Sequence, residues 1–229
     1  MYFFLDPNFR VGQYELNAEE SKHGIRVLRL KEGDQILIGD GDGQQFTCEI
    51  SSTNNYTIKV KVLETNEFPK PKKELCVAIS PTKNLSRFEW FLEKATELGV
   101  SEIVPIITTR TERPRIKEER SEKIILTASK QSQRAYIPKL LPTLSFQDFL
   151  TANEQKGIIA HCLSHRGRKS LKEVSEDHKS LILIGPEGDF TPAEIDAAER
   201  RGFQSVVLNE NRLRTETAGI FAVAMLQMP

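Results

Sequence analysis

The stretch LILIGPEGDFTPAEIDAAERRGFQSVVLNENRLRTETAGIFAVAML, residues 181–226, decides the fold class of this 229-residue chain. Its apolar runs at 181–184 and 205–208 are typical of strands that are buried on both faces of a sheet. A glycine-containing loop, 185–189, follows the first run, and a polar loop, 209–214, follows the second. Loops that leave neighbouring strands at their carboxyl ends form the ligand site of open α/β sheets. We therefore expect the two strands to be neighbours and their loops to build a ligand site.

The same stretch carries signals for two helices. Thr191 is a helix-capping residue, Pro192 suits the first helical position, and Glu194 completes a capping box with Thr191. Gly202 is typical of the residue that ends a helix. The apolar segment 215–227 predicts a second, buried helix. The order strand, helix, strand, helix is typical of an α/β domain.

The loop GPEGD lacks the residues of the common phosphate-binding loops. No Lys followed by Ser or Thr comes after the glycines, and their spacing differs from GxGxxG. The pattern therefore excludes the usual P-loop and dinucleotide-binding mechanisms. It leaves two interpretations open, which are a ligand site of another kind and two ordinary βα units with well-capped helices.

Composition and cysteine content are typical of a globular protein in a reducing compartment. Apolar residues make up 38% of the chain and charged residues 28%, with a net charge of zero. No run approaches the ~20 apolar residues that span a bilayer, and the start, MYFFLDPNFR, lacks the features of a signal peptide. The three cysteines, Cys48, Cys76 and Cys162, are odd in number and far apart. We expect a cytoplasmic protein without disulfide bonds.

Charge is distributed unevenly along the chain, although the total is zero. Residues 110–139 contain nine Lys or Arg and four Asp or Glu, a net charge of +5. A local basic region supports RNA binding even where the overall charge is neutral. The alternative is a solvated helix face with mixed charges.

Residues 1–70 predict a small β-rich domain, and residues 71–229 a second domain. Asn17 begins a short helix that carries Ile25, Val27 and Leu28. Strands are expected over 2–5, 13–16, 35–38, 45–51 and 56–63, the last three as a meander. A Gly- and Asp-rich turn at 39–43 lacks the closing Glu of a calcium loop, so we interpret it as a hairpin turn. The segment 67–73, with two prolines and three lysines, is the predicted linker.

The second domain alternates strands and helices, which predicts a parallel sheet. Strands are expected over 75–79, 103–107 and 157–163. Helices are expected from Ser86, as a capping box, to Gly99, over 118–135, and after Ser145 as cap. The first of these helices has an apolar face made of Phe88, Phe91, Leu92, Ala95 and Leu98.

A metal site is not expected. His161, Cys162 and His165 lie close in sequence, but His161 and Cys162 point to opposite faces of the predicted strand. A fourth ligand and a metal-binding spacing are missing. The alternative for His161 and Leu163 is a strand end that borders the ligand pocket.

Five motifs resemble one known family. HGIRVLR, KATELGV, QSQR, IGPEGDFTPAEI and LNENRLRTETAGI occur in that order and cover nearly the whole chain. Together they resemble the bacterial 16S ribosomal RNA uridine-N3 methyltransferase family (RsmE-like), a branch of the SPOUT methyltransferases. Two positions differ from the family's usual motifs, because Asp189 and Asn209 occupy positions where Gly is common. We expect the loop at Asn209 to keep its form, since Asn tolerates a left-handed backbone.

The resemblance implies a PUA-like β-barrel domain followed by a SPOUT-type, trefoil-knotted α/β methyltransferase domain. It also implies S-adenosyl-L-methionine as methyl donor, 16S rRNA or the small ribosomal subunit as partner, and a homodimer. General topology rules weigh against knots, so the knot rests on the resemblance alone.

The resemblance implies roles for three groups of residues. The donor is expected at Leu163, Ile184, Gly185, Glu187, Gly188, Leu208, Asn209, Leu213, Arg214 and Thr215. RNA is expected at Arg10, His23, Arg26, Arg29, Lys94, Arg110, Gln131 and Arg134. Arg214 is expected to stabilise an imidate anion or to bind phosphate. Glu187 and Glu216 are both candidates for the base that takes the N3 proton, and Glu216 has the alternative of a helix-dipole acid.

Two rival functions remain. A non-catalytic RNA-binding or ribosome-assembly protein needs the basic region but not both GPEG and RLRTETA. An α/β enzyme that acts on a small nucleotide is disfavoured by the missing Walker and Rossmann patterns and by the additional β domain.

Overall fold

The computed structural model describes residues 1–10, 12, 15–163, 167–174, 176 and 180–227. The chain forms two compact units, one of Met1–Pro71 with Leu126–Ile137, and one of Lys72–Ile125 with Pro138–Pro229. The division into domains 1–70 and 71–229 stays a prediction. The sequence did not indicate that Leu126–Ile137 packs with the first unit.

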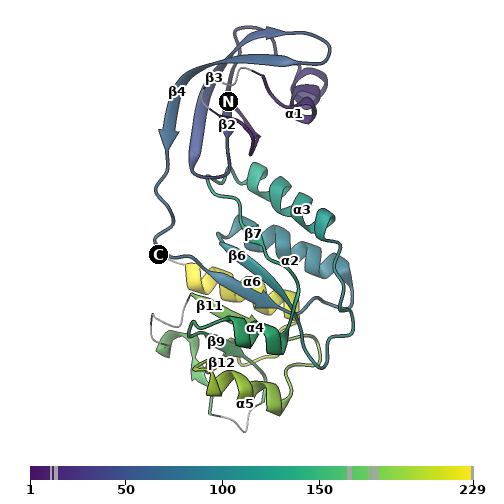
Figure 1. Ribbon diagram of the computed structural model, residues 1–229, viewed down its shortest axis with the longest axis vertical. Helices are drawn as coiled ribbons and strands as arrows, with labels where there is room; N and C mark the ends of the chain where they lie inside the picture. Colours follow the sequence, from purple (N-terminus) through teal and green to yellow (C-terminus); the bar gives the residue numbers. More distant parts are fainter. Residues whose placement is uncertain (11, 13–14, 164–166, 175, 177–179, 228–229) are drawn as a thin grey trace. The chain divides into compact units, whose positions relative to one another are not determined.

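The amino-terminal unit is built on a four-stranded sheet in the order β1-β2-β3-β4 (Figure 1). Its strands are β1 (Tyr2–Leu5), β2 (Gln35–Gly39), β3 (Gln44–Thr53) and β4 (Ile58–Glu67). The predicted meander is confirmed, because β2, β3 and β4 pair antiparallel, whereas β1 pairs parallel with β2. Alternating apolar residues such as Ile36, Ile38, Phe46 and Ile50 are fully buried on one face of the sheet.

A short helical segment of this unit begins where the sequence predicted it. Asn17 caps α1 (Ala18–His23) by accepting a hydrogen bond from the backbone of Glu20. The helix continues as a π-helical turn, Gly24–Leu28, and ends at Arg29, which is left-handed with φ 54°. The strand predicted over 13–16 is wrong in its described part. There, Glu15 pairs with Lys59 as an isolated antiparallel bridge outside the named strands, and residues 13–14 lie outside the described residues.

The segment Leu126–Ile137 contacts the amino-terminal unit through polar and aromatic groups. Lys130 pairs with Glu20 at 2.5 Å and lies 5.3 Å from the ring centre of Phe4. The hydroxyl of Tyr136 donates to the carbonyl of Phe68 at 2.8 Å. These contacts explain why the segment packs with this unit although its sequence resembles an ordinary surface helix.

The carboxy-terminal unit contains an eight-stranded sheet in the order β10-β12-β9-β11-β5-β6-β7, with β8 paired to β6. Every pairing in it is parallel, as the sequence predicted. The strands are β5 (Cys76–Ile79), β6 (Glu102–Ile107), β7 (Lys139–Leu140), β8 (Leu144–Ser145), β9 (Ile158–Ala160), β10 (Lys169–Ser170), β11 (Leu181–Ile184) and β12 (Gln204–Val207).

One expectation about this sheet is wrong. The strands β11 and β12 are not neighbours, because β9 lies between them and pairs with both. The strand predicted over 157–163 is also shorter, so that 161–163 follow β9 as loop. Three strand ends, rather than two, therefore meet at the carboxyl edge of the sheet.

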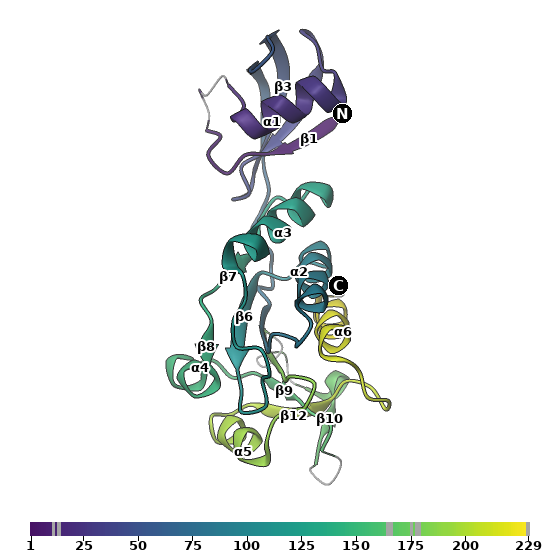
Figure 2. The same cartoon turned by 90° about the vertical axis from the view of Figure 1, so that its right-hand side faces the viewer.

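Helices cover both faces of this sheet (Figure 2). They are α2 (Leu85–Glu97), α4 (Phe146–Ala152), α5 (Pro192–Arg200) and α6 (Thr215–Gln227). The chain also forms α3 (Glu118–Gln131), whose second half belongs to the amino-terminal unit, and a short 3-10 turn at Leu171–Glu173. On one face, α4 and α5 bury Phe146, Phe149 and Ile195 against Leu181 and Leu183 of β11.

On the other face, α2 and α6 lie against each other (Figure 2). A side chain at Gly219 of α6 would approach the ring of Phe91 of α2 to 2.6 Å. Glycine is required there because the two helices pack so closely. The apolar face predicted for α2 is confirmed for Phe91 and Ala95, which are fully buried, but Leu98 is 40% exposed.

Two helix boundaries differ from the prediction. Asn84, rather than Ser86, caps α2 and accepts a hydrogen bond from the Ser86 backbone at 3.1 Å. The helix expected over 118–135 ends at Gln131, because Gln133 adopts a left-handed backbone with φ 52°. The caps Thr191 of α5 and Ser145 of α4 are confirmed.

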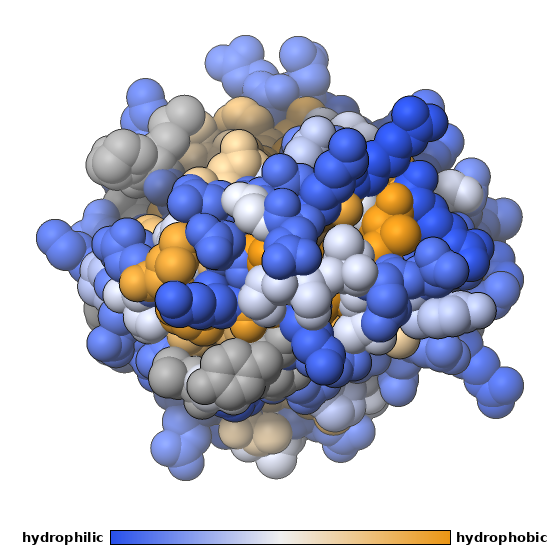
Figure 3. Space-filling view, turned by 90° about the horizontal axis from the view of Figure 1, so that it is seen from above, coloured by the Kyte–Doolittle hydropathy of each residue, from blue (hydrophilic) through white to orange (hydrophobic). Residues whose placement is uncertain are grey.

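One face of the molecule is drawn by residue hydropathy in Figure 3. The face drawn in Figure 3 is mainly hydrophilic, with apolar side chains in small separate patches. Among the described helices, none has both the length and the apolar character needed to cross a membrane. The cysteines Cys48, Cys76 and Cys162 are free thiols.

Candidate active site

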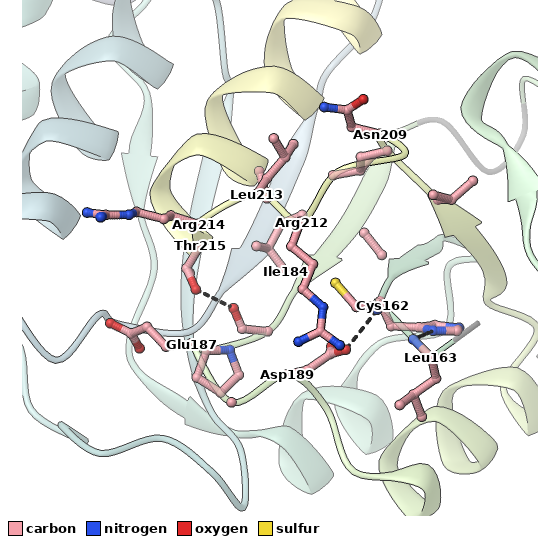
Figure 4. A pocket seen from close by; sticks show the side chains of 18 of the residues that line it. Cys162, Leu163, Ile184, Glu187, Asp189, Asn209, Arg212, Leu213, Arg214 and Thr215 are labelled. Carbon is pink, nitrogen blue, oxygen red and sulfur yellow. Dashed lines mark hydrogen bonds between the residues drawn. The ribbon is translucent and has the colours of Figure 1, made fainter. Parts of the chain in front are cut away.

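A cavity of about 530 Å³ opens at the carboxyl ends of β9, β11 and β12 (Figure 4). In the sheet register, Ala160 lies between Ile184 of β11 and Val206 of β12. The three strands therefore end at the same level, and their loops enclose a common space. This is where open α/β sheets bind ligands.

Every residue that we assigned to donor binding lines this cavity. They are Leu163, Ile184, Gly185, Glu187, Gly188, Leu208, Asn209, Leu213, Arg214 and Thr215. The ligand site expected from the two loops is thus present as a cavity, although β9 contributes to it as well.

The first loop, GPEGD, is held by hydrogen bonds from distant parts of the unit. Thr215 at the start of α6 donates its hydroxyl to the carbonyl of Gly185 at 3.1 Å (Figure 4). Arg110, which follows β6, donates to the carbonyl of Gly188 at 2.6 Å. The backbone amide of Lys83 donates to Oε1 of Glu187 at 3.0 Å. These bonds tie the loop to three other segments of the unit.

A second set of bonds fixes the helix that follows this loop. The Glu194 carboxylate, in the first turn of α5, accepts hydrogen bonds from the backbone and hydroxyl groups of both Thr191 and Thr109 at 2.7–3.0 Å. The Glu194 amide donates in return to the Thr191 hydroxyl at 3.2 Å. Burial by itself raises the pKa of Glu194, but these hydrogen bonds outweigh burial and lower it. The capping box predicted from the sequence thus also ties the loop after β6 to α5.

The space beside Gly188 is occupied by a neighbouring side chain. A Cβ atom at Gly188 would lie 3.2 Å from Cδ and 3.3 Å from Cβ of Arg110. The stem of Arg110 therefore rests on the glycine while its guanidinium binds the carbonyl. The resemblance placed Gly188 among the donor-binding residues, and the neighbour that the structure describes at its Cβ position is Arg110.

The two departures from the family's glycines differ in backbone geometry. Asp189 is left-handed, with φ 62°, so this position has the conformation that glycine favours. Asn209 has no positive φ, so the left-handed backbone that we considered there is not present. Asn209 therefore carries no conformational cost of that kind.

Models of known families match both parts of the chain. An RNA methyltransferase domain matches residues 69–227, and an RNA methyltransferase PUA domain matches residues 16–63. The chain belongs to the RNA methyltransferase family. The predicted fold class is confirmed as an α/β methyltransferase domain preceded by a PUA-type β domain. The trefoil knot stays a prediction.

Individual relatives of this family agree with the match. The chain is 35% identical, over 203 residues and 86% of both chains, to the ribosomal RNA small subunit methyltransferase E of Mesomycoplasma hyopneumoniae. A crystal structure described as a probable rRNA-methyltransferase from Porphyromonas gingivalis is 37% identical, with a TM-score of 0.91, over 98% of this chain and 96% of that one.

A third relative was solved with a ligand. The ribosomal RNA small subunit methyltransferase E of Neisseria gonorrhoeae, bound to S-adenosyl methionine, is 28% identical with a TM-score of 0.87. The match covers 99% of this chain and 97% of that chain.

The three catalytic candidates of this methyltransferase occupy different surroundings. Arg214 and Glu187 are exposed and line the cavity. In Figure 4, Arg214 extends away from Arg212 and Asp189. Glu216 is 6% exposed and does not line the cavity. Its Oε1 lies 3.7 Å from Nε of Arg87, and its Oε2 has no hydrogen-bond partner among the described residues.

Several cavity residues had no predicted role. Arg168, Asn211 and Arg212 line the cavity with Cys162 and Asp189. Burial raises the pKa of the Cys162 thiol, and the nearby Asp189 carboxylate raises it further. Asn211 and Arg212 lie in the polar loop 209–214, which the sequence placed at the ligand site without a role for either side chain. Arg168 and Cys162 follow β9, and the sequence could not place that segment at the cavity without the strand order.

The eight candidates for RNA binding lie in both units. In the amino-terminal unit, Arg26, Arg29 and Gln131 are exposed, and His23 packs edge-on against Phe4. Arg10 donates to the carbonyls of Pro7 and Phe9, each at 2.7 Å.

The remaining candidates are engaged within their own units. Burial lowers the pKa of Arg134, whose Nε donates to the carbonyl of Tyr136 at 3.1 Å. In the carboxy-terminal unit, Lys94 pairs with Glu93 and Glu97, and Arg110 lines the cavity. Arg110 thus has a contact within the site that its assignment to RNA did not include.

Metal binding has no support in the described residues. They contain no group of three or more His, Cys, Asp or Glu side chains placed to hold an ion. His161 is buried, and its Nδ1 accepts a hydrogen bond from the backbone of Leu163 at 3.3 Å. His165, which we considered with it, lies outside the described residues.

Proposed function

We propose that this protein transfers a methyl group from S-adenosyl-L-methionine to N3 of one uridine in the 16S rRNA of the small ribosomal subunit. The observation that carries the proposal is the cavity at the ends of β9, β11 and β12, whose lining includes all ten predicted donor residues. The small-subunit rRNA methyltransferases among the relatives support the substrate, and the relative bound to S-adenosyl methionine supports the donor.

The residues of the cavity fit such a donor. Ligand sites commonly have volumes of roughly 300–1,000 Å³, and this cavity has about 530 Å³. Its walls combine apolar side chains such as Ile184, Leu208 and Leu213 with the backbone groups of two loops. Apolar walls suit an adenine ring, and backbone groups suit ribose and amino-acid atoms. The donor, when bound, supplies an electrophilic methyl group on a sulfonium.

The chain must also prepare the nucleophile. N3 of uridine carries an imide proton that has to leave before the nitrogen can attack. Glu187 is the better candidate for the base, because it lines the cavity and Glu216 does not. The Lys83 amide bonds only Oε1 of Glu187, which leaves the second oxygen for a proton. Arg214 offers several N–H donors to the anion that forms.

The target base has to be accessible. N3 lies on the Watson–Crick edge, so the uridine must be unpaired or flipped out of a helix. Arg26 and Arg29, which are exposed on the PUA-type unit, suit contacts with the phosphates of structured RNA. We propose that this unit holds the RNA while the second unit binds the base.

A homodimer is the proposed assembly. The resemblance to the family supports it, and α6 is apolar in nearly every position from Ala218 to Leu226. Trp90 on the neighbouring α2 is 46% exposed, as expected of a residue at an interface. Analytical ultracentrifugation at micromolar concentration should give the mass of two chains, and a single-chain mass across that range would contradict the proposal.

The location proposed is the cytoplasm. Free thiols at all three cysteines suit a reducing compartment, and a ribosomal substrate is found there.

The experiment that tests the function is mass mapping of 16S rRNA from cells with and without the gene. The proposal predicts one methyl group on a uridine N3 that disappears on deletion. An unchanged methylation pattern would refute it. Binding of S-adenosyl-L-methionine by the purified protein, followed by calorimetry, separates an enzyme from an RNA-binding protein without a donor site.

A further inference from the structure

Asp189 connects two walls of the cavity. Its Oδ2 accepts a hydrogen bond from the backbone amide of Cys162 at 2.8 Å (Figure 4). Its Oδ1 accepts from the amide of Phe190 at 2.8 Å. Cys162 belongs to the segment after β9, whereas Asp189 ends the GPEGD loop after β11. The carboxylate therefore fastens the β9 segment to the loop.

The backbone at this position is one that glycine adopts more easily. Asp189 has φ 62°, and its amide donates to the carbonyl of Pro186 at 2.9 Å, which closes a tight turn. A Gly at this position would have neither the strain nor a side chain. An aspartate kept in a left-handed conformation points to a role for its carboxylate.

Other contacts of the loop reach different parts of the unit. The carbonyls of Gly185 and Gly188 are bound by α6 and by the loop after β6, and Glu187 is bound by the backbone before α2. Among the hydrogen bonds described for this loop, the Asp189 contact is the one that reaches the β9 segment. Without it, that wall of the cavity loses its direct tie to the loop.

We propose that Asp189 is a positioning residue, which holds the segment after β9 against the GPEGD loop and so preforms the donor site. The inference rests on the proposed function for its ligand. A charged acceptor strengthens the hydrogen bond, and a site ordered before binding loses less freedom when the ligand enters. Replacement of Asp189 by Gly should therefore weaken donor binding.

The test compares Asp189→Gly with Asp189→Asn in the full-length protein. The first readout is amide hydrogen exchange of Cys162, measured by NMR without ligand. Asp189→Gly should increase the exchange rate by at least roughly tenfold, because the amide loses its partner. Asn retains one carbonyl oxygen and tolerates φ > 0, so Asp189→Asn should give a smaller increase.

The second readout is calorimetric binding of S-adenosyl-L-methionine and of S-adenosyl-L-homocysteine. Asp189→Gly should weaken both about tenfold, the loss expected for one hydrogen bond to a charged group. A neutral product and a cationic donor should be affected equally, since the carboxylate acts on the protein backbone. Thermal unfolding should change little, because relief of the strained backbone offsets the lost hydrogen bond.

Three outcomes would overturn the inference. They are an unchanged exchange rate of the Cys162 amide, an unchanged affinity for both ligands, and a loss of affinity for the cationic donor alone, which would indicate direct charge attraction. Failure of the wild-type protein to bind either ligand would instead refute the proposed function. The exchange rate still decides in that case whether Asp189 holds the β9 segment.

Discussion

Replacement of Arg110 by Ala separates two roles for this residue, in RNA binding and in support of the GPEGD loop. Its guanidinium donates to the Gly188 carbonyl at 2.6 Å, and its stem contacts the same glycine. A hydrogen bond that involves a charged group contributes about 1.5–3 kcal/mol. Because Arg110 is exposed, we take the lower end, about 1.5 kcal/mol. That value corresponds to roughly a tenfold loss of affinity for S-adenosyl-L-methionine.

The assay is calorimetry of donor binding in the absence of RNA, beside filter binding of 16S rRNA fragments. Arg113→Ala is the matched control, because Arg113 is an exposed arginine of the same segment and does not line the cavity. Arg110→Lys keeps the charge and most of the stem but not the planar fork, and should fall between wild type and Ala. Wild-type donor affinity in Arg110→Ala, together with weakened RNA binding, would refute the role in the loop and support the RNA assignment.

Three further changes test other parts of the site. Gly188→Val should weaken donor binding, because a side chain there displaces the stem of Arg110; unchanged calorimetric affinity in a folded variant would contradict this placement of the loop. Arg214→Lys should fold and bind donor nearly as well as wild type, while its single-turnover methylation of 16S rRNA falls roughly a hundredfold, the loss of one preorganised donor; a near-normal rate would indicate that charge alone suffices. Arg26→Ala with Arg29→Ala should weaken RNA binding and reduce its salt dependence by a slope of about 1.5, with donor affinity intact; a loss of donor affinity with normal RNA binding would reverse the assignment.

Local signals allowed much of the carboxy-terminal unit to be predicted. The strand at 181–184, the capping box of Thr191 and Glu194, and the helix Thr215–Gln227 all occur as expected. Each of these features depends on residues that lie within a few positions of one another in the sequence. The family motifs placed the donor residues because they lie in these same loops.

Features that depend on long-range contacts were predicted less well. The position of β9 between β11 and β12 follows from strand order, which short-range patterns do not contain. For the same reason, the sequence did not indicate that Arg168 lines the cavity beside the loop 209–214, or that Arg110 reaches Gly188. Where two capping residues lay close together, at Asn84 and Ser86, local preference did not decide between them.

The two residues that replace expected glycines, Asp189 and Asn209, also show what the sequence could not predict. A comparison of motifs identified both Asp189 and Asn209 as unusual. It could not show that the two residues differ in backbone conformation. Asp189 is left-handed and Asn209 is not. The contact from Asp189 to Cys162 joins residues that are 27 positions apart, so neither motif contained it.

The central claim is methyl transfer to uridine N3, and the most direct measurement is transfer of an isotope-labelled methyl group by the purified protein. S-adenosyl-L-methionine with a ¹³C-methyl group would be incubated with protein and with unmodified 16S rRNA, both free and in small subunits. Mass spectrometry of the digested RNA would then locate the label. We predict label on N3 of a single uridine in at least one of the two substrates. Absence of label from both substrates, although the protein binds the donor, or label on a different atom or base, would contradict the account.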